Sequence, residues 1–236
     1  MNITFRCDPA LIDVLPRPTP AKAALPSWLK QMPPRAASAV HQRAIRTVKQ
    51  CPPFVDAMSH GFMMPLPCDV RVEGDGQFAW EWPRPELTVP AHPRAPLSFH
   101  VPEQIAGSPL ADGGRAALKF NSFWTIELEP GWSLMAVHPI NRDDLPFRLI
   151  TGLVDADRFN EVGINFPAIW TQPSFRGVLP RGTPIAQCFA VPREAPSLHF
   201  EAMSDAQRER YAELAGSILA GPGVYRKGFR AKRGAG

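Results

Sequence analysis

Residues 70–82 have the sequence VRVEGDGQFAWEW, and this stretch indicates the fold class most clearly. Apolar and polar side chains alternate in VRVE and again in FAWEW, with a Gly-Asp-Gly segment between the two runs. A period of two places alternate side chains on one face of a strand, and a short glycine-containing connection is typical of a β-hairpin. The stretch therefore predicts two antiparallel strands.

The same pattern continues toward the C-terminus. Residues 124–128 and 132–137 alternate on either side of Glu129-Pro130-Gly131, an order that suits a type II turn, so we predict a second hairpin there. Three further apolar runs, at 147–154, 163–170 and 185–191, are bounded by glycine or proline. Because strands dominate, we predict a mainly β fold, an antiparallel β-sandwich or a small barrel.

Two segments favour helices instead. Residues 52–61 begin with two prolines, which suit a first helical turn, and end at a glycine that can take the left-handed conformation. Residues 204–219 predict the one longer helix, since Ser204 and Gln207 match a capping box and Tyr211, Leu214 and Ile218 share a face. We expect this helix to pack on the sheet.

Proline content suggests three parts of the chain. Proline accounts for 28 of 236 residues, which argues against an all-helical protein because proline interrupts helices. We expect residues 1–50 to be a proline-rich arm that packs on the main domain. Residues 51–224 form the predicted β-rich domain, and residues 225–236 the predicted flexible basic tail.

Charge and hydropathy exclude some classes of protein. The net charge is +4, yet residues 225–236 alone hold five basic and no acidic side chains. Nucleic-acid binding is therefore expected only through this tail, with a merely solvated tail as the alternative. The chain has no apolar run long enough for a membrane span and no evident signal peptide, so we expect a cytoplasmic protein. No Cys-x-x-Cys pair is present, which excludes the common zinc and thioredoxin spacings.

Polar residues are densest between positions 138 and 161. Asp155 directly follows the apolar run 149–154, and side chains at strand ends often build sites, so we predict Asp155 and His138 as catalytic residues. Around them we predict ligand-binding residues that supply a guanidinium, polar groups and aromatic walls: Arg142, Asn141, Asp157, Trp132 and Trp170. An anionic group would bind to the guanidinium.

A metal site is a second interpretation. Asp56 and His60 are four residues apart on the predicted helix 52–61 and so share a face. With His138 they would form a two-histidine, one-carboxylate set suited to iron(II), and a divalent metal would then be the cofactor. The alternative is that these histidines are structural or simply exposed.

Two resemblances to known families add expectations. The sequences GLVDAD at 152–157 and LPRGTPIAQ at 179–187 resemble the C-terminal half of dUTPase and dCTP-deaminase proteins, over residues 130–192. That resemblance implies a β-clip fold, a nucleotide-like substrate and a homotrimer, with Asp155 orienting a water or sugar hydroxyl and Gln187 on a core-facing strand. The segments 25–28 and 47–56 resemble an uncharacterised bacterial and phage protein family, which implies only that arm and domain form one unit.

We therefore expect a small-ligand enzyme or binding protein with a polar pocket for an anionic or nucleotide-like molecule. The sequence leaves open whether the protein is an enzyme. The alternatives are a metal-dependent, non-haem-iron oxygenase-like enzyme and a non-catalytic β scaffold that assembles through the arm and tail. Such a scaffold would act as a homo-oligomer or with protein partners.

Overall fold

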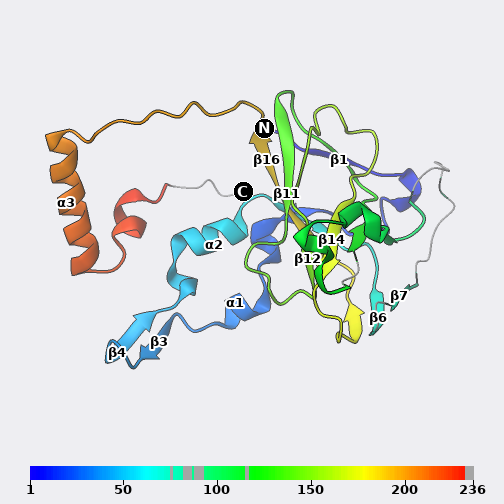
Figure 1. The fold of residues 1–236 in the computed structure, drawn as a ribbon, viewed down its shortest axis with the longest axis horizontal. Coiled ribbons are helices and arrows are strands. Elements are labelled where there is room, and N and C mark those ends of the chain that lie inside the picture. The colour runs from blue at the N-terminus through cyan, green and yellow to red at the C-terminus, as the bar shows by residue number, and fades with distance from the viewer. Residues whose placement is uncertain (75–76, 82–86, 88–92, 115–116, 232–236) are drawn as a thin grey trace. The chain divides into compact units, whose positions relative to one another are not determined.

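The structure is a computed structural model that describes residues 1–74, 77–81, 87, 93–114 and 117–231 (Figure 1). It is mainly β, with several antiparallel sheets and few helices, as the alternating sequence patterns predict. The chain divides into two compact units. Unit 1 comprises residues 1–32 and 56–193, and unit 2 comprises residues 33–55 and 194–236.

The largest sheet of unit 1 has five antiparallel strands in the order β13-β11-β16-β5-β2. Strands β11 and β16 pair over six residues and lie side by side in Figure 1. The strands of this sheet are β13 Gly152–Val154, β11 Trp132–Val137, β16 Pro184–Pro192, β5 Phe62–Pro65 and β2 Thr19–Pro20.

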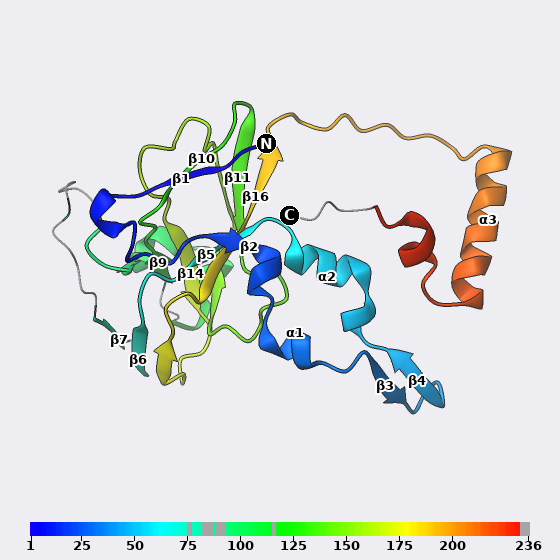
Figure 2. The same ribbon diagram turned by 180° about the vertical axis from the view of Figure 1, so that it is seen from behind.

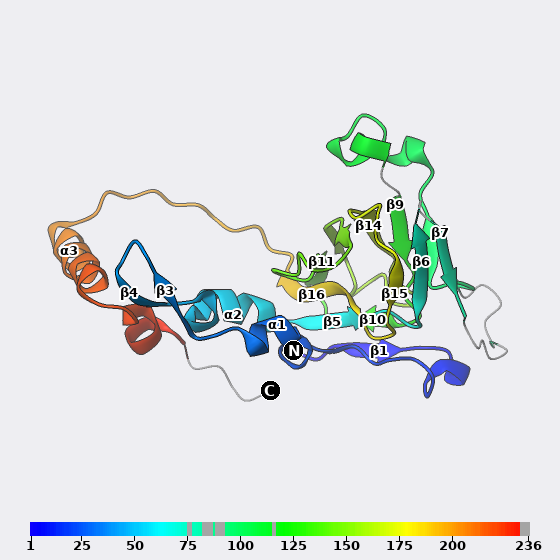
Figure 3. The same ribbon diagram turned by 90° about the horizontal axis from the view of Figure 1, so that it is seen from below.

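Three smaller antiparallel sheets complete unit 1, and Figure 3 shows β6, β7 and β15 beside β9 and β14. The first has the order β12-β14-β9-β8, with β12 Phe147–Leu149, β14 Phe166–Trp170, β9 Ala117–Phe120 and β8 Leu97–Phe99. The second has the order β15-β6-β7, with β15 Gly177–Leu179, β6 Val70–Gly74 and β7 Gln77–Trp80. The third pairs β1 Thr4–Arg6 with β10 Thr125–Glu127. Among the described residues none of these sheets closes into a barrel.

One hydrophobic core joins the sheets of unit 1. Its largest fully buried side chains include Phe120, Phe147 and Phe166, and both β6 and β15 contribute further apolar residues. The first 32 residues also take part. Leu11 and Leu15 are buried in the core, and the indole nitrogen of Trp124 donates a hydrogen bond to the Pro16 carbonyl at 3.1 Å. The short helix α1, Ser27–Gln31, buries Leu29.

Helix α2 spans Pro52–Ser59, as its two N-terminal prolines predict. The chain then turns at Gly61, which has φ +72°. A Cβ atom at Gly61 would lie 2.1 Å from the Cys188 carbonyl oxygen on β16, so only glycine allows this close approach. The glycine therefore sets how α2 leads into β5.

The two predicted hairpins have different outcomes. The first is confirmed, because β6 pairs with β7, although Asp75, Gly76 and Trp82 lie outside the described residues. The second is wrong in its pairing, since β10 pairs with β1, and β11 pairs with β13 and β16. The turn between them does form, with the Trp132 amide donating to the Glu129 carbonyl at 3.3 Å. The turn thus reverses the direction of the chain but does not determine which strands pair with each other.

Unit 2 contains a hairpin and a helix. Strand β3, Arg35–Ser38, pairs with β4, Arg43–Arg46 (Figure 2). Helix α3, Asp205–Ala220, begins at the predicted capping box of Ser204 and Gln207. None of the α3 residues is buried, and Tyr211 and Ile218 of its predicted apolar face are exposed. Residues Tyr225–Phe229 form one π-helical segment. Across the described part of the chain, the helices are too short or too polar to cross a membrane.

Candidate ligand-binding groove

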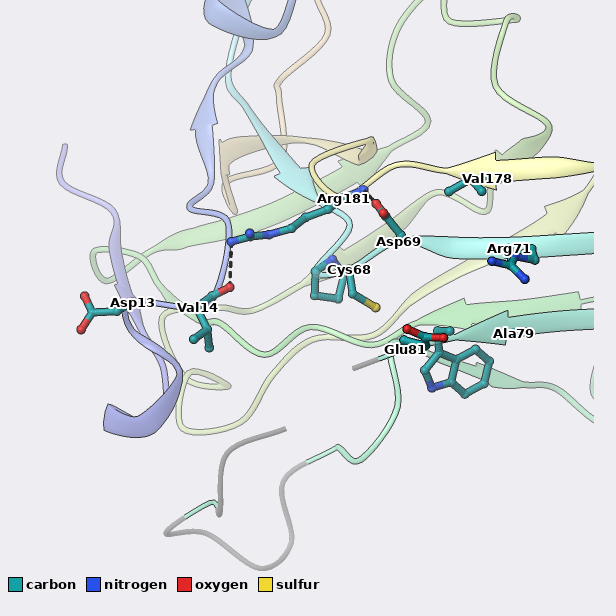
Figure 4. A pocket seen from close by; sticks show the side chains of 11 residues that line it. Asp13, Val14, Cys68, Asp69, Arg71, Ala79, Glu81, Val178 and Arg181 are labelled. Atoms are coloured by element: carbon teal, nitrogen blue, oxygen red, sulfur yellow. Dashed lines mark hydrogen bonds between the residues drawn. The ribbon is translucent and has the colours of Figure 1, made fainter. Parts of the chain in front are cut away.

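A groove of about 840 Å³ lies in unit 1 beside the sheet β15–β6–β7 (Figure 4). Residues from three distant parts of the chain line it: the segment after Leu11, the strands β6 and β7 with their flanking residues, and the turn that leaves β15. Its ionisable side chains are those of Asp13, Cys68, Asp69, Arg71, Glu81 and Arg181. None of these is among the site residues that the sequence predicts.

Strand alternation directs Arg71 into the groove. Val70 and Val72 on either side of it are buried in the core, so the side chain between them points to the opposite face of the sheet. Arg71 pairs with Ala79 on one side and with Val178 on the other. These three residues form one row across the exposed face of the sheet.

Two carboxylates lie next to that row. Val70 pairs with Trp80, so the register places Asp69, which precedes Val70, opposite Glu81, which follows Trp80. Like charges directly opposite each other on a sheet repel. A third carboxylate, Asp13, lines the same groove. A positively charged or hydrogen-bond-donating group bound between the carboxylates would relieve their repulsion.

A tight turn positions Arg181 at the groove. The Thr183 amide donates to the Pro180 carbonyl at 3.0 Å, and Gly182 has φ +84°, as the third position of a type II turn requires. The Arg181 amide donates to Asp69 Oδ1 at 2.6 Å, and its guanidinium donates from Nη2 to the Val14 carbonyl at 2.8 Å (Figure 4). Arg181 thereby ties the N-terminal segment to the sheet.

Arg71 differs from Arg181 in its contacts. Its guanidinium forms no hydrogen bond or ion pair with any described residue, and the residue is exposed.

Burial, reinforced by the neighbouring charge of Asp69, raises the pKa of the Cys68 thiol to about 11. Because a thiol with this pKa is protonated at neutral pH, Cys68 forms part of the wall and is not an activated nucleophile.

The two predicted catalytic residues lie at opposite ends of β11. In the antiparallel pairing of β11 with β13, Leu134 faces Val154, so Asp155 lies beside Ser133 at the start of β11. His138 directly follows the end of the same strand. Five residues of extended chain separate Ser133 from His138, or about 16 Å. The structure therefore does not bring Asp155 and His138 together.

Asp155 belongs to a cluster that ties strand ends together. The Ser133 hydroxyl donates to Asp155 Oδ1 at 2.7 Å, and Arg193 Nη1 lies 3.3 Å from Asp155 Oδ2. Arg193 also pairs with Asp157, which accepts a hydrogen bond from the Gly131 amide at 3.0 Å. That amide, together with the guanidinium, lowers the pKa of the Asp157 carboxyl. The cluster joins the ends of β11, β13 and β16.

His138 and Arg142 are engaged by their own loop. His138 Nδ1 accepts from the Leu149 amide at 3.3 Å, and Nε2 lies 3.1 Å from the Arg142 carbonyl oxygen, to which it can donate. Burial lowers the pKa of His138, which favours this neutral form. The Arg142 guanidinium donates to both oxygens of Asp144, at 2.8 and 2.9 Å, so its charge is already paired with a carboxylate. Asn141 lies in the exposed turn of this loop with φ +58°.

The two predicted pocket tryptophans pack with the core. Trp170 is buried, its ring meets Phe78 edge-on at 5.1 Å, and its indole nitrogen donates to the Gln172 carbonyl at 2.7 Å. Trp132 is half-buried against the core. Neither ring lines the groove.

The structure does not assemble the predicted metal site. Among the described residues no three His, Cys, Asp or Glu side chains gather as metal ligands, and this includes His60, Asp56 and His138. His60 stacks on Phe189 with ring centres 5.6 Å apart, while Asp56 is buried in α2. Helix α2 ends at Ser59, so His60 lies beyond it, and His138 is held by its own loop.

Comparison with known proteins gives no assignment: no family model matches the chain, and no curated protein matches it.

Proposed function

We propose that unit 1 binds a small molecule in the groove, and that this ligand carries both an anionic and a cationic group. The observation that supports this most is the unpaired guanidinium of Arg71 beside carboxylates in a space of about 840 Å³. Sites for small ligands commonly measure about 300–1,000 Å³ and contain a few well-placed polar groups. The groove thus has the size and the polar groups of a ligand site.

Arg71 is the residue that would hold the anionic group. A guanidinium offers a planar fork of donors that matches a carboxylate or a phosphate. The other guanidinium in the described lining, Arg181, already donates to Val14. Arg142, from which the sequence predicted anion binding, is paired with Asp144. The proposed anion contact therefore moves from Arg142 to Arg71.

The carboxylates favour a zwitterionic ligand over a nucleotide. Asp13 and Glu81 form no ion pair with a described residue, and Asp69 uses one of its oxygens to accept from the Arg181 amide. A phosphate monoester brings up to about two negative charges, which these carboxylates would repel. An amino acid or a similar molecule places its carboxylate on Arg71 and its ammonium group between Asp69 and Glu81.

Thermal unfolding in the presence of amino acids and nucleoside monophosphates tests the proposal. At a concentration of 100 times its dissociation constant, a ligand should add about 2.7 kcal/mol to the stability of the folded protein. We expect at least one amino acid to do this, and Arg71→Gln to abolish the effect. Arg148→Gln, which removes an exposed guanidinium from β12, is the matched control and should keep it. Stabilisation by nucleotides alone, or an undiminished response in Arg71→Gln, would overturn the proposal.

We also propose the β-clip-like arrangement and the homotrimer that the resemblance over residues 130–192 implies. Gln187 supports the arrangement of the strands, because the resemblance places it on a core-facing strand and it is completely buried on β16, whereas the homotrimer follows from the resemblance alone. Light scattering during size-exclusion chromatography tests this point directly. A mass of three chains agrees with the proposal, and a monomer contradicts it.

A further inference from the structure

Unit 2 concentrates positive charge. Residues 33–55 contain four basic and no acidic side chains, and residues 214–236 contain five basic and none acidic. Unit 2 as a whole has eleven basic and five acidic residues, whereas unit 1 has fifteen and seventeen. The net positive charge of the protein thus belongs to unit 2, where residues 225–236 hold five of the eleven basic side chains.

The hairpin β3–β4 places two of these charges directly opposite each other. Arg35 pairs with Arg46 across the two strands, and both side chains are exposed. Neither guanidinium forms an ion pair with a described residue. Like charges at facing positions destabilise a sheet, and an anion held between them removes that penalty. The pair is therefore suited to a phosphate or another anion.

A segment from the other end of the sequence lies next to this hairpin. A Cβ atom built on Gly223 would lie only 3.1 Å from Arg46 Nη1, and Arg226 Nη1 lies 3.5 Å from Gln50 Oε1. Arg226 is thereby placed near the arginines of the hairpin, although about 180 residues of chain separate them. No single run of sequence shows this grouping.

Two aromatic rings accompany the basic side chains. Tyr225 and Phe229 are 46% and 59% exposed and are four residues apart in the π-helical segment. Arg226 and Lys227 lie between them in the sequence and are exposed as well. Exposed rings next to arginines are typical of surfaces on which the bases of a single strand stack while guanidinium groups bind the phosphates.

We propose that unit 2 binds single-stranded nucleic acid, with Arg35, Arg46 and Arg226 on the phosphates and Tyr225 and Phe229 against the bases. The forked donors of three arginines favour phosphodiesters, which follow one another at short intervals along a strand. The aromatic pair favours a single strand over a duplex, because a duplex keeps its base faces stacked. This surface is made of residues of unit 2, whereas residues of unit 1 line the groove.

Fluorescence anisotropy with a labelled single strand of about 20 nucleotides tests the proposal on the full chain. The test variant is Arg35→Gln/Arg46→Gln, and the control is Arg148→Gln/Arg176→Gln, which removes two exposed charges from unit 1. Because each lost phosphate contact reduces the slope of log affinity against log salt by about 0.7, we expect a slope smaller by about 1.4 in the test variant only. Its affinity in low salt should fall about tenfold.

Two further measurements separate a binding role from a structural one. Because the variant Arg35→Gln/Arg46→Gln lacks the facing like charges, its unfolding temperature should equal or exceed that of the wild type. That result would show that its loss of binding does not come from misfolding. Tyr225→Ala/Phe229→Ala should weaken binding to the single strand while keeping the salt slope. Equal affinity and slope in Arg35→Gln/Arg46→Gln and the wild type would overturn the proposal. So would binding to phosphatidylserine vesicles without binding to the oligonucleotide.

Discussion

The two units of this protein differ in what surrounds their apolar side chains. Every buried hydrophobic residue in the described part of the chain belongs to unit 1, including Phe120 and Phe166. Unit 2 leaves large apolar side chains in solvent, with Phe200 91% exposed and Val40 88% exposed. Burial of apolar surface is the main force that stabilises a fold, so unit 1 should supply nearly all the stability.

The charged side chains of the two units also differ in their surroundings. Charged side chains of unit 1 either tie strand ends together, as Arg193 does with Asp157, or line the groove, as Arg71 does. The facing arginines of unit 2, Arg35 and Arg46, have no core beneath them to disturb. We infer that unit 1 provides stability and a small-molecule site, and that unit 2 provides a surface for a polyanion.

Truncation of a phenylalanine in each unit should have the most unequal effects. Phe120→Ala removes a fully buried ring and should lower the free energy of unfolding by about 3–5 kcal/mol. Phe200→Ala removes an exposed ring and should change it by less than about 0.5 kcal/mol. Urea denaturation followed by circular dichroism measures both. Similar losses in the two variants would show that unit 2 has a core of its own.

A buried amide in unit 1 should give the next largest effect. Gln187 Oε1 accepts from the Ile140 amide at 2.9 Å, and Nε2 donates to the carbonyls of Ala57 and His60 at 2.9 and 2.7 Å. Gln187→Ala leaves these groups without their partner and should cost roughly 3 kcal/mol. The control Gln77→Ala, at an exposed position of β7, should cost almost nothing. A loss below about 1 kcal/mol in Gln187→Ala would show that water replaces the side chain.

Local features of the fold could be predicted from the sequence because their causes are local. Alternation from Val70 to Trp80 gave a real hairpin, and the capping box at Ser204 marks the start of α3. The pairing of β10 with β1 was missed because it joins residues more than 100 positions apart. Nothing in the Glu129–Gly131 turn signals that β11 instead pairs with β13 and β16.

The candidate sites were missed for the same reason. Asp155 and His138 are close in sequence, but antiparallel pairing places them at opposite ends of β11. The groove combines Asp13, Arg71 and Arg181, which only the folded chain brings together. One signal was present in the sequence: Arg71 lies between two valines, and such a residue must face away from the core.

The Asp157 carboxyl should make the free energy of unfolding depend on pH in the acid range. Its pKa is lowered in the folded protein, so its contribution is complete above about pH 4 and is lost as the pH falls through the folded-state pKa. The difference in urea midpoint between the wild type and Asp157→Asn should therefore become smaller as the pH is lowered from about 6 to roughly 2–3. Arg193→Gln removes the partner and should weaken this dependence. An equal difference at all pH values would contradict the assignment.

His138 should give the smallest effect, at a higher pH. Burial lowers its pKa, so the unfolded chain binds the proton first as the pH falls below about 6.5. Stability from the neutral ring is complete above that pH, declines below it and becomes constant beneath the folded-state pKa. Titration of the imidazole by NMR should give a midpoint below 6.5 (roughly the usual value for histidine). A midpoint above that value would show a buried charge partner instead.

Hydrogen exchange measured with and without a single-stranded oligonucleotide tests most directly whether unit 1 supplies the stability and unit 2 binds the nucleic acid. We expect slow exchange in β11 and β16 with or without the oligonucleotide, because these central strands should open only on global unfolding. Added oligonucleotide should slow exchange only in residues 35–46 and 225–230. New protection confined to β6, β7 and β15, or no new protection anywhere, would contradict it.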